Sequence, residues 1–413
     1  MTLTIIIAIV AFLVITLVLV GLLLFAKAKL TTSGDVTIDI NGGEKVLIAE
    51  SGGTLLSTLA NNNVFLPSAC GGGGSCGMCK CQVLEGGGEL LPTETGFINR
   101  KMAKEHWRLG CQVKVKENLK IHVPESVLGV KKWECEVISN RNISTFLKEF
   151  VVKLPEGENL KFRSGGYIQI DIPKYDAIKF SDMDIEEPYR EDWDKMKMWD
   201  LVTKNPEPTF RAYSMANHPA EGNIIMLNIR IATPPWDRAA GAFMNVNPGI
   251  CSSYIYSLKP GDKITISGPY GEFFVKDTPN EKMFIGGGAG MAPMRSHIFD
   301  LFLTKKTTVP VTFWYGARSK REIFYEEQFE EIAREHENFR YEVALSEPKP
   351  EDNWTGYTGF IHQVIYDNYL KYHDAPEDIE YYICGPGPMT AAVEKMLDNL
   401  GVPKENIMYD NFG

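Results

Sequence analysis

The first stretch of the chain is hydrophobic without a break, whereas the remainder alternates between apolar and polar positions. Residues Thr2 to Ala26 carry no charged side chain and consist mainly of Ile, Leu and Val. A helix rises about 1.5 Å per residue, so this run is long enough to cross the roughly 30 Å hydrocarbon core of a membrane. The pattern predicts a single transmembrane helix over residues 2–26.

The residues beside this run decide between a membrane anchor and a cleaved leader. A secretory signal peptide carries a positive N-terminal region and a small-residue cleavage site. Neither accompanies this run, and Lys27 and Lys29 follow it directly. Because positively charged flanks remain on the cytoplasmic side, we expect the C-terminal bulk of the chain to face the cytoplasm.

Three further patterns divide the rest of the chain. A hairpin pattern, a helical pattern and returning strand patterns predict an α+β domain of the β-grasp type over residues 33–128. Short strands with frequent turns predict an antiparallel β-barrel over residues 131–275. Strands that alternate with helices predict a doubly wound α/β domain over residues 276–413. The fold class is therefore multidomain, with one transmembrane α-helix before three folded domains.

Residues 174–210 interrupt the barrel pattern with many acidic side chains and several Trp and Tyr residues. We interpret this segment as a solvated surface insertion, because acidic loops are usually exposed. A docking surface for a partner is the alternative interpretation. The formal net charge of −10 and the absence of a basic patch argue against nucleic acid as a partner.

Four cysteines carry the strongest chemical signal in the chain: Cys70, Cys76, Cys79 and Cys111. The first three lie in the glycine-rich run CGGGGSCGMC. A plant-type [2Fe–2S] cluster needs four thiolates in a C-x4-C-x2-C run with a distant fourth Cys, and this chain has one more residue in its first gap. A disulfide and a zinc site are weaker alternatives, since zinc is usually held by separated Cys pairs or by Cys with His. Cys81 is a rival to Cys79 as a ligand.

Short motifs in the predicted barrel suit a flavin. The Arg of RAYS offers a fork for pyrophosphate, its Tyr a ring face and its Ser a hydroxyl, and the small-residue turn GICSS offers amides for phosphate. The order of RAYS, GICSS and GPYG resembles that of the ferredoxin–NADP reductase superfamily. The resemblance implies FAD bound by Arg211, Tyr213, Ser214, Gly249, Cys251 and Ser252.

The last predicted domain carries motifs for a nicotinamide nucleotide. Its first strand runs into a glycine turn that opens a helix, which lets backbone N–H groups approach a pyrophosphate. The glycines are Gly286, Gly287, Gly288 and Gly290. The later motifs YGAR and CGPGPM match the same superfamily, and the resemblance extends the nucleotide site to Arg318 and Gly385. The segment RSKRE after the second strand fits either NADH or NADPH.

The same resemblance implies three residues at the hydride-transfer site. Cys384 would lie beside the nicotinamide ring, Ser214 at the flavin edge, and the terminal aromatic Phe412 on the flavin until nicotinamide displaces it. NADH delivers two electrons together, whereas a [2Fe–2S] cluster accepts one. A flavin handles both and therefore belongs between them.

The order of membrane helix, ferredoxin domain, flavin barrel and nicotinamide domain resembles the F subunits of bacterial sodium-translocating NADH:quinone oxidoreductases. The resemblance implies electron entry from NADH through FAD and a 2Fe–2S cluster, integral membrane subunits as partners, ubiquinone as the final acceptor, and a place in the bacterial inner membrane. Sodium export would then occur in the partners, because the N-terminal run holds no ionisable group. A membrane-tethered NADH-dependent reductase of an oxygenase is the alternative.

Overall fold

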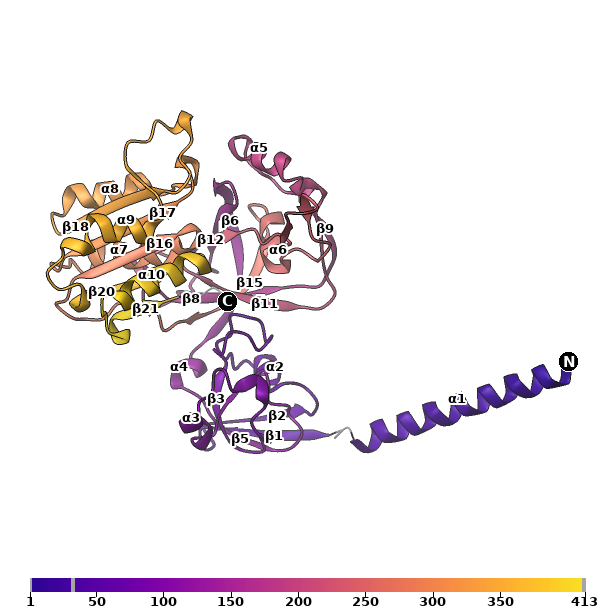
Figure 1. Cartoon of the computed structure of the whole chain (residues 1–413). Coiled ribbons are helices and arrows are strands. Elements are labelled where there is room, and N and C mark those ends of the chain that lie inside the picture. Colours follow the sequence, from indigo (N-terminus) through magenta and orange to yellow (C-terminus); the bar gives the residue numbers. More distant parts are fainter. Residues whose placement is uncertain (1, 31–33, 411–413) are drawn as a thin grey trace. The chain divides into compact units, whose positions relative to one another are not determined.

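The computed structural model describes residues 2–30 and 34–410 (Figure 1). These residues form two compact units. One comprises Met1–Ser68 with Gly72–Val130, and the other comprises Ala69–Gly71 with Lys131–Gly413. The unit boundary at residues 130 and 131 falls close to the predicted boundary between the first two folded domains. The other predicted domain boundaries stay predictions.

The N-terminal apolar run forms helix α1 (Thr2–Leu30). Its described side chains between residues 6 and 22 are exposed on all sides of the helix, as Phe12 and Leu17 illustrate. Among the residues that the structure describes, no helix meets the length and apolarity that a membrane crossing demands. The prediction of a transmembrane span over residues 2–26 is therefore not confirmed.

The first unit is built on a five-stranded sheet in the order β2-β1-β5-β3-β4. Strand β1 pairs with β5 in parallel, whereas the other neighbours are antiparallel. This is the predicted α+β arrangement of a hairpin, a helix and returning strands. Its elements are β1 (Asp35–Ile40), β2 (Lys45–Glu50), α2 (Leu55–Asn61), β3 (Lys80–Glu85), α3 (Arg100–Lys104), β4 (Trp107–Leu109), β5 (Leu119–His122) and α4 (Glu125–Leu128).

Six antiparallel strands form the barrel of the second unit, in the order β11-β8-β15-β6-β7-β12. An isolated bridge between Met215 and Leu227 joins the two outer strands, so the sheet closes on itself as predicted. Helix α6 (Ile250–Ser257) packs against β11. The barrel strands are β6 (Lys131–Ser144), β7 (Leu147–Lys153), β8 (Tyr167–Ile172), β11 (Thr209–Ser214), β12 (Ile224–Arg230) and β15 (Lys263–Tyr270). A small hairpin, β13 (Trp236–Asp237) and β14 (Ala242–Phe243), follows β12.

The acidic insertion is folded, which corrects the expectation of a solvated loop. It contains the antiparallel pair β9 (Tyr175–Lys179) and β10 (Val202–Asn205) and the helix α5 (Glu187–Lys195). Trp193 of α5 is completely buried, and its indole N–H donates to the carbonyl of Thr145 at 2.9 Å. The fully buried Lys148 also donates to the carbonyl of Asp184. These bonds fix the insertion against strands β6 and β7.

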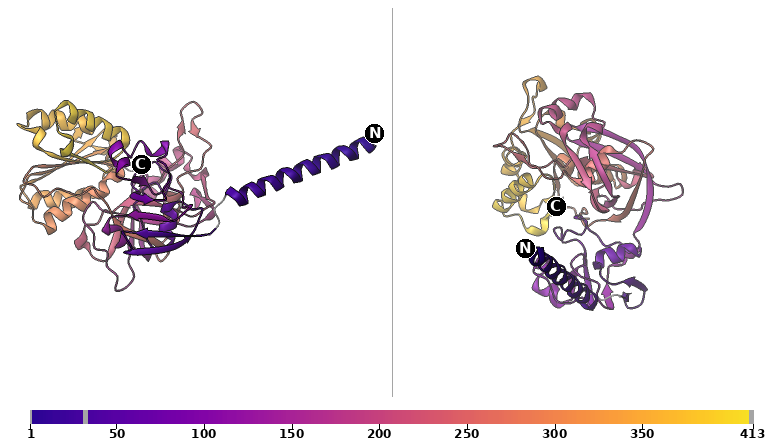
Figure 2. Two further views of the ribbon diagram at one scale, coloured as in Figure 1. Left: turned by 90° about the horizontal axis from the view of Figure 1, so that it is seen from below. Right: turned by 90° about the vertical axis from the view of Figure 1, so that its right-hand side faces the viewer.

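The rest of the second unit is a six-stranded parallel sheet in the order β19-β18-β17-β16-β20-β21, as a doubly wound domain requires. Helices α7 and α8 cover one face and α9 and α10 the other, each over its own apolar core (Figure 2, left). The strands are β16 (Lys282–Gly287), β17 (Val311–Ala317), β18 (Phe339–Leu345), β19 (Tyr357–Thr358), β20 (Glu380–Cys384) and β21 (Ile407–Tyr409). The helices are α7 (Met291–Phe299), α8 (Glu326–Glu335), α9 (Ile361–Asn368) and α10 (Gly387–Asn399).

Candidate functional site

The cysteine loop between α2 and β3 needs glycine for two physical reasons. Gly74 and Gly77 have φ angles of 77° and 66°, in the left-handed region that side chains avoid. A Cβ atom at Gly77 would also lie 2.3 Å from the ring of Phe97, and one at Gly74 would lie 2.8 Å from the amide nitrogen of Gln112. The loop therefore has a backbone path that other residues cannot follow.

Two of the four predicted cluster ligands lie side by side. Cys79 and Cys111 are buried, with 1% and 5% of their surfaces exposed, and their contact raises the pKa of Cys79, as burial also does. The backbone fixes this pair, because the N–H of Gly110 donates to the carbonyl of Cys79 at 2.8 Å. A two-iron cluster takes two thiolates for each iron, so an adjacent pair of cysteines fits one iron.

The other two predicted ligands are more accessible. Cys70 and Cys76 are partly exposed, and Cys70 lies in the segment Ala69–Gly71 that groups with the second unit. Within residues 2–30 and 34–410, no three His, Cys, Asp or Glu side chains surround a position suited to one metal ion. Which cysteines hold the cluster therefore stays a prediction.

Cys81, the rival ligand, occupies a different environment. It is completely buried in strand β3, and burial raises the pKa of its thiol to about 12. Its register partner on β4 is Arg108. Cys81 thus lies within strand β3, whereas Cys79 precedes that strand and adjoins Cys111, which favours Cys79 as the ligand.

A buried ion pair, which no sequence pattern indicated, supports the strand that leads to Cys111. The side chains of Glu94 and Arg108 are 0% and 8% exposed, and their closest atoms, Oε2 and Nη2, are 2.7 Å apart. Glu94 also accepts the backbone N–H of Leu109 at 2.8 Å. Despite the cost of burying its charge, Glu94 has a pKa below the usual range because of these donors. The strand is thus fixed two residues before Cys111.

The predicted flavin residues meet at one end of the barrel. Arg211, Tyr213 and Ser214 lie on β11, and Gly249 immediately precedes α6, whose first turn contains Cys251 and Ser252. Burial chiefly raises the pKa of Tyr213, and the nearby guanidinium of Arg211 opposes this rise. The predicted small-residue turn is thus the start of a helix, whose N–H groups suit a phosphate.

The predicted nucleotide glycines lie beside the CGPGPM motif. Strands β16 and β20 are neighbours, and Gly286 is in register with Cys384. Gly290 approaches this strand so closely that a Cβ atom would lie 2.0 Å from the carbonyl oxygen of Cys384. Cys384 is completely buried, and burial raises the pKa of its thiol. The glycine turn and Cys384 therefore form one surface at the carboxyl ends of the parallel strands.

Asp410, which was not among the predicted site residues, joins this group. Its carboxylate accepts a hydrogen bond from Ser214 Oγ at 2.5 Å. Burial raises the pKa of Asp410, and its charge in turn acts on the Cys384 thiol. The only sequence signal was one acid in the tail beside the predicted Phe412, which itself lies outside the described residues.

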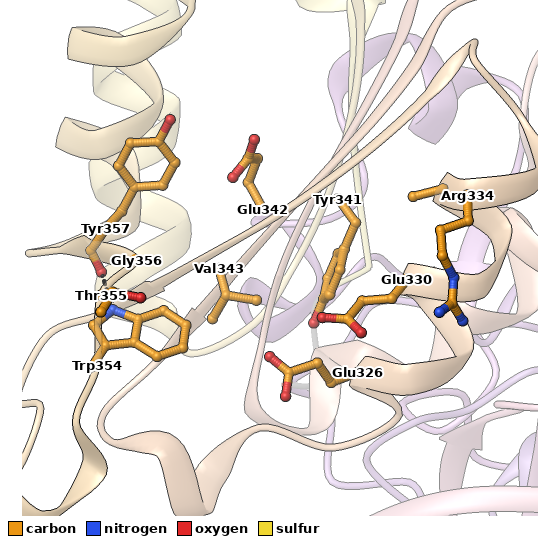
Figure 3. Close-up of a pocket in the computed structure, with 11 residues that line it drawn as sticks. Glu326, Glu330, Arg334, Tyr341, Glu342, Val343, Trp354, Thr355, Gly356 and Tyr357 are labelled. Carbon is orange, nitrogen blue, oxygen red and sulfur yellow. Dashed lines mark hydrogen bonds between the residues drawn. The ribbon is translucent and has the colours of Figure 1, made fainter.

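A cavity of about 700 Å³ lies between α8, β18 and the segment before β19 (Figure 3). Glu326 and Glu330 of α8 and the ring of Tyr341 lie on one side of it, and Trp354 lies on the other. Burial and the neighbouring charge of Glu330 raise the pKa of Glu326. None of the predicted site residues that the structure describes lines this cavity.

Three family models match successive parts of the chain. Residues 38–116 match a 2Fe-2S iron-sulfur cluster binding domain, residues 198–275 an oxidoreductase FAD-binding domain, and residues 284–395 an oxidoreductase NAD-binding domain. FAD, a 2Fe–2S cluster and NAD are therefore the cofactors of the domains that this chain contains.

Solved structures with low identity share the fold. The Amycolatopsis cytochrome P450 reductase GcoB is 20% identical with a TM-score of 0.62, and the match covers 91% of this chain and 98% of that protein. A ferredoxin reductase in carbazole 1,9a-dioxygenase is 23% identical with a TM-score of 0.58, and the match covers 92% of this chain and 99% of that protein. At this identity the likeness concerns the fold alone.

Curated relatives are far more similar. The F subunit of the Na(+)-translocating NADH-quinone reductase of Actinobacillus pleuropneumoniae is 59% identical over 98% of both chains. The F subunit of the same enzyme in Methylococcus capsulatus is 58% identical over 100% of both chains. Identity at this level over the whole length shows that the chain belongs to the family of Na(+)-translocating NADH-quinone reductase F subunits.

Proposed function

We propose that this chain is the electron-entry subunit of a membrane NADH:quinone reductase. It takes electrons from NADH and delivers them singly to other subunits, which reduce ubiquinone and export sodium. The observation that carries this proposal is identity of 57–59% to F subunits of such reductases over essentially the whole chain, together with matches to all three cofactor domains. Bound FAD supplies the chemistry that links two-electron donors to one-electron acceptors.

The chain's own residues prepare the nicotinamide end of this reaction. The glycine turn before α7 is open beside Gly288, which suits the approach of a pyrophosphate, and the contact of Gly290 with Cys384 places that turn against β20. A small buried thiol at Cys384 provides an apolar, water-excluding wall without occupying the volume that a flat ring needs. These features support the proposed site of Gly286, Gly287, Gly288, Gly290, Cys384 and Gly385.

Ser214 and Asp410 have a positioning role in this proposal. A short hydrogen bond to Asp410 orients the hydroxyl of Ser214, which would otherwise rotate freely. Asp410 also joins the tail of the nicotinamide domain to strand β11 of the barrel. The pair therefore holds the flavin-binding strand and the Cys384 strand at a defined separation, as hydride transfer requires.

At the other end of the chain, four cysteines are proposed to hold the cluster: Cys70, Cys76, Cys79 and Cys111. The adjacent pair Cys79 and Cys111 supplies two thiolates in a preformed arrangement, while Gln112 Nε2 lies 3.5 Å from Cys111 Sγ. An N–H group directed at a ligand sulfur stabilises added negative charge. The buried Cys81 stays outside this set.

Attachment to the membrane is a further part of the proposal. The apolar, uncharged sequence of residues 2–26 and the exposed apolar side chains of α1 support a single-pass anchor, with the remaining domains in the cytoplasm. Such a surface would be costly to leave in water, so lipid and the other integral membrane subunits are its proposed neighbours. The ion pathway belongs to those subunits.

The decisive experiment is anaerobic titration of the purified, FAD-loaded chain with NADH, followed by optical and electron paramagnetic resonance spectra. We expect the flavin absorbance to bleach and the cluster signal to appear afterwards. A flavin that NADH leaves oxidised would refute the proposal. Deleting residues 2–26 should move the chain to the soluble fraction and abolish co-purification of membrane subunits, while NADH still reduces the flavin.

A further inference from the structure

The segment that follows β17 contains three cations, at residues 318, 320 and 321. In a doubly wound domain, the end of the second strand faces the adenosine ribose of the nucleotide. An acid there binds a 2′-hydroxyl, whereas a cation there binds a 2′-phosphate. The segment Arg318–Glu322 would therefore be expected to favour NADPH if its cations were available.

The side chain of Arg321 is already paired with acidic side chains. Arg321 Nη1 lies 3.1 Å from Asp192 Oδ2, and Arg321 Nη2 lies 3.8 Å from Glu191 Oε2. Both acids belong to α5 of the insertion, which comes from the barrel and not from the nicotinamide domain. The Arg321 and Asp192 side chains are each less than one-third exposed, so solvent weakens their attraction less than it does at an open surface.

The segment after β18 contacts the other two cationic residues, through the side chain of Arg318 and the backbone of Lys320. Arg318 Nε lies 3.7 Å from Glu347 Oε2, and the backbone N–H of Glu347 donates to the carbonyl of Arg318 at 2.7 Å. The N–H of Lys320 donates to Asp352 at 3.1 Å. These two backbone bonds fasten the segment between β17 and η7 (Lys320–Glu322) to the loop that follows β18.

The cavity beside this segment adds further negative charge. Glu326 lies close enough to Lys320 for the lysine to oppose the rise of the Glu326 pKa. Glu330 and Glu342 line the same cavity, together with the cationic Arg334 (Figure 3). A 2′-phosphate carries close to two negative charges and would have to enter this field, whereas a 2′-hydroxyl carries none.

We propose that the insertion selects NADH over NADPH, with Asp192 as the specificity-determining residue that keeps Arg321 from a 2′-phosphate. The insertion thus acts on nucleotide choice although it lies within the sequence of the barrel. Its ion pair with Arg321 also connects α5 to the nicotinamide domain, and a purely structural role is the competing explanation. The inference rests on the proposed function, since it concerns the nucleotide that reduces the flavin.

The test compares NADPH with NADH as reductants of the FAD-loaded full chain. Asp192→Asn keeps the shape of the side chain and removes its charge. We expect the ratio of kcat/KM for NADPH to that for NADH to rise about tenfold, because Arg321 becomes available for a charge-assisted bond to phosphate. Adding Arg321→Ala to Asp192→Asn should reverse the gain, which a purely structural role would not produce.

A matched control is Glu187→Gln, which removes the same charge from an exposed position on α5. This variant should leave the ratio unchanged. Glu191→Gln removes the second carboxylate of α5 that faces Arg321 and, at 58% exposure, should raise the ratio in the same direction even if Asp192→Asn folds poorly. An unchanged ratio in both Asp192→Asn and Glu191→Gln would overturn the inference. Failure of NADH to reduce the unmodified chain would instead overturn the proposed function.

Discussion

Ser214 on the flavin-binding strand donates a hydrogen bond to Asp410 near the end of the chain, with 2.5 Å between the two oxygens. The two residues are 196 positions apart in the sequence. Ser214 ends strand β11 of the barrel, whereas Asp410 follows strand β21 of the parallel sheet. Burial raises the pKa of Asp410, while the hydroxyl of Ser214 opposes this rise by stabilising the carboxylate. The bond thus partly offsets the cost of burying a charged carboxylate beside the Cys384 thiol.

Removing this bond should slow flavin reduction. A hydrogen bond to a charged group contributes about 1.5–3 kcal/mol, which corresponds to roughly a tenfold to hundredfold change in rate if it acts in the transition state. We expect Ser214→Ala to lower the rate of flavin reduction by NADH in this range, measured by stopped-flow absorbance. Ser181→Ala, at an exposed position of the insertion, is the control. Equal rates of flavin reduction in Ser214→Ala and Ser181→Ala would show that Ser214 does not contribute to the reaction.

The choice between Cys79 and Cys81 can be tested by two serine substitutions. Cys79→Ser should lose the cluster, because Cys79 adjoins Cys111. Cys81→Ser should keep it, because Cys81 is sequestered in the sheet core. Iron and sulfide analysis with visible circular dichroism measures the outcome. Cluster retention in Cys79→Ser with loss in Cys81→Ser would reverse the assignment, and NADH should still reduce the flavin in both.

Breaking the buried ion pair in the first unit should be costly. Glu94→Gln removes the negative charge that faces Arg108, in an environment where only 8% of the Arg108 side chain is exposed. We expect a loss of about 3–5 kcal/mol in the free energy of unfolding of this unit. Denaturant unfolding followed through the cluster absorbance measures it.

An exposed ion pair in the same unit provides the comparison. Glu85 and Lys120 are also in contact, at 2.8 Å, but more than half of each side chain is exposed. Glu85→Gln should therefore cost about 0–1 kcal/mol. Similar losses for Glu85→Gln and Glu94→Gln would show that burial does not determine the effect.

The buried His297 should make the second unit sensitive to acid. Burial lowers the pKa of His297 from 6.5 to about 3, and its Nε2 has no hydrogen-bond partner among the described residues. Below about pH 6.5, this histidine is protonated in the unfolded chain but stays neutral in the folded chain. The free energy of unfolding therefore falls as the pH decreases from 6.5 toward 3. Thermal unfolding should show a weaker pH dependence in His297→Gln than in the unmodified chain, and the exposed His106→Gln should follow the latter.

The sequence predicted the elements whose hydrophobic period is sustained, and missed those that depend on distant partners. Alternation of strands and helices indicated the parallel sheet, because each strand there is buried on both faces. Helix α5 was not predicted, because its nine residues are mostly polar. Its one buried side chain, Trp193, packs into the core of the barrel, and the local sequence does not indicate that contact. The pairing of Asp410 with Ser214, and of Asp192 with Arg321, likewise arises from the folded topology and leaves no local pattern.

The glycine turn before α7 sets two different limits on substitution. Gly290 has no space for a Cβ atom beside the carbonyl of Cys384, whereas Gly288 has open space but a φ of 56°. Asn and Asp tolerate that φ, so a saturation library selected for folding alone should recover them at position 288 and only Gly at position 290. Two neighbouring glycines would thus show different evolutionary freedom, one restricted by volume and the other by backbone conformation.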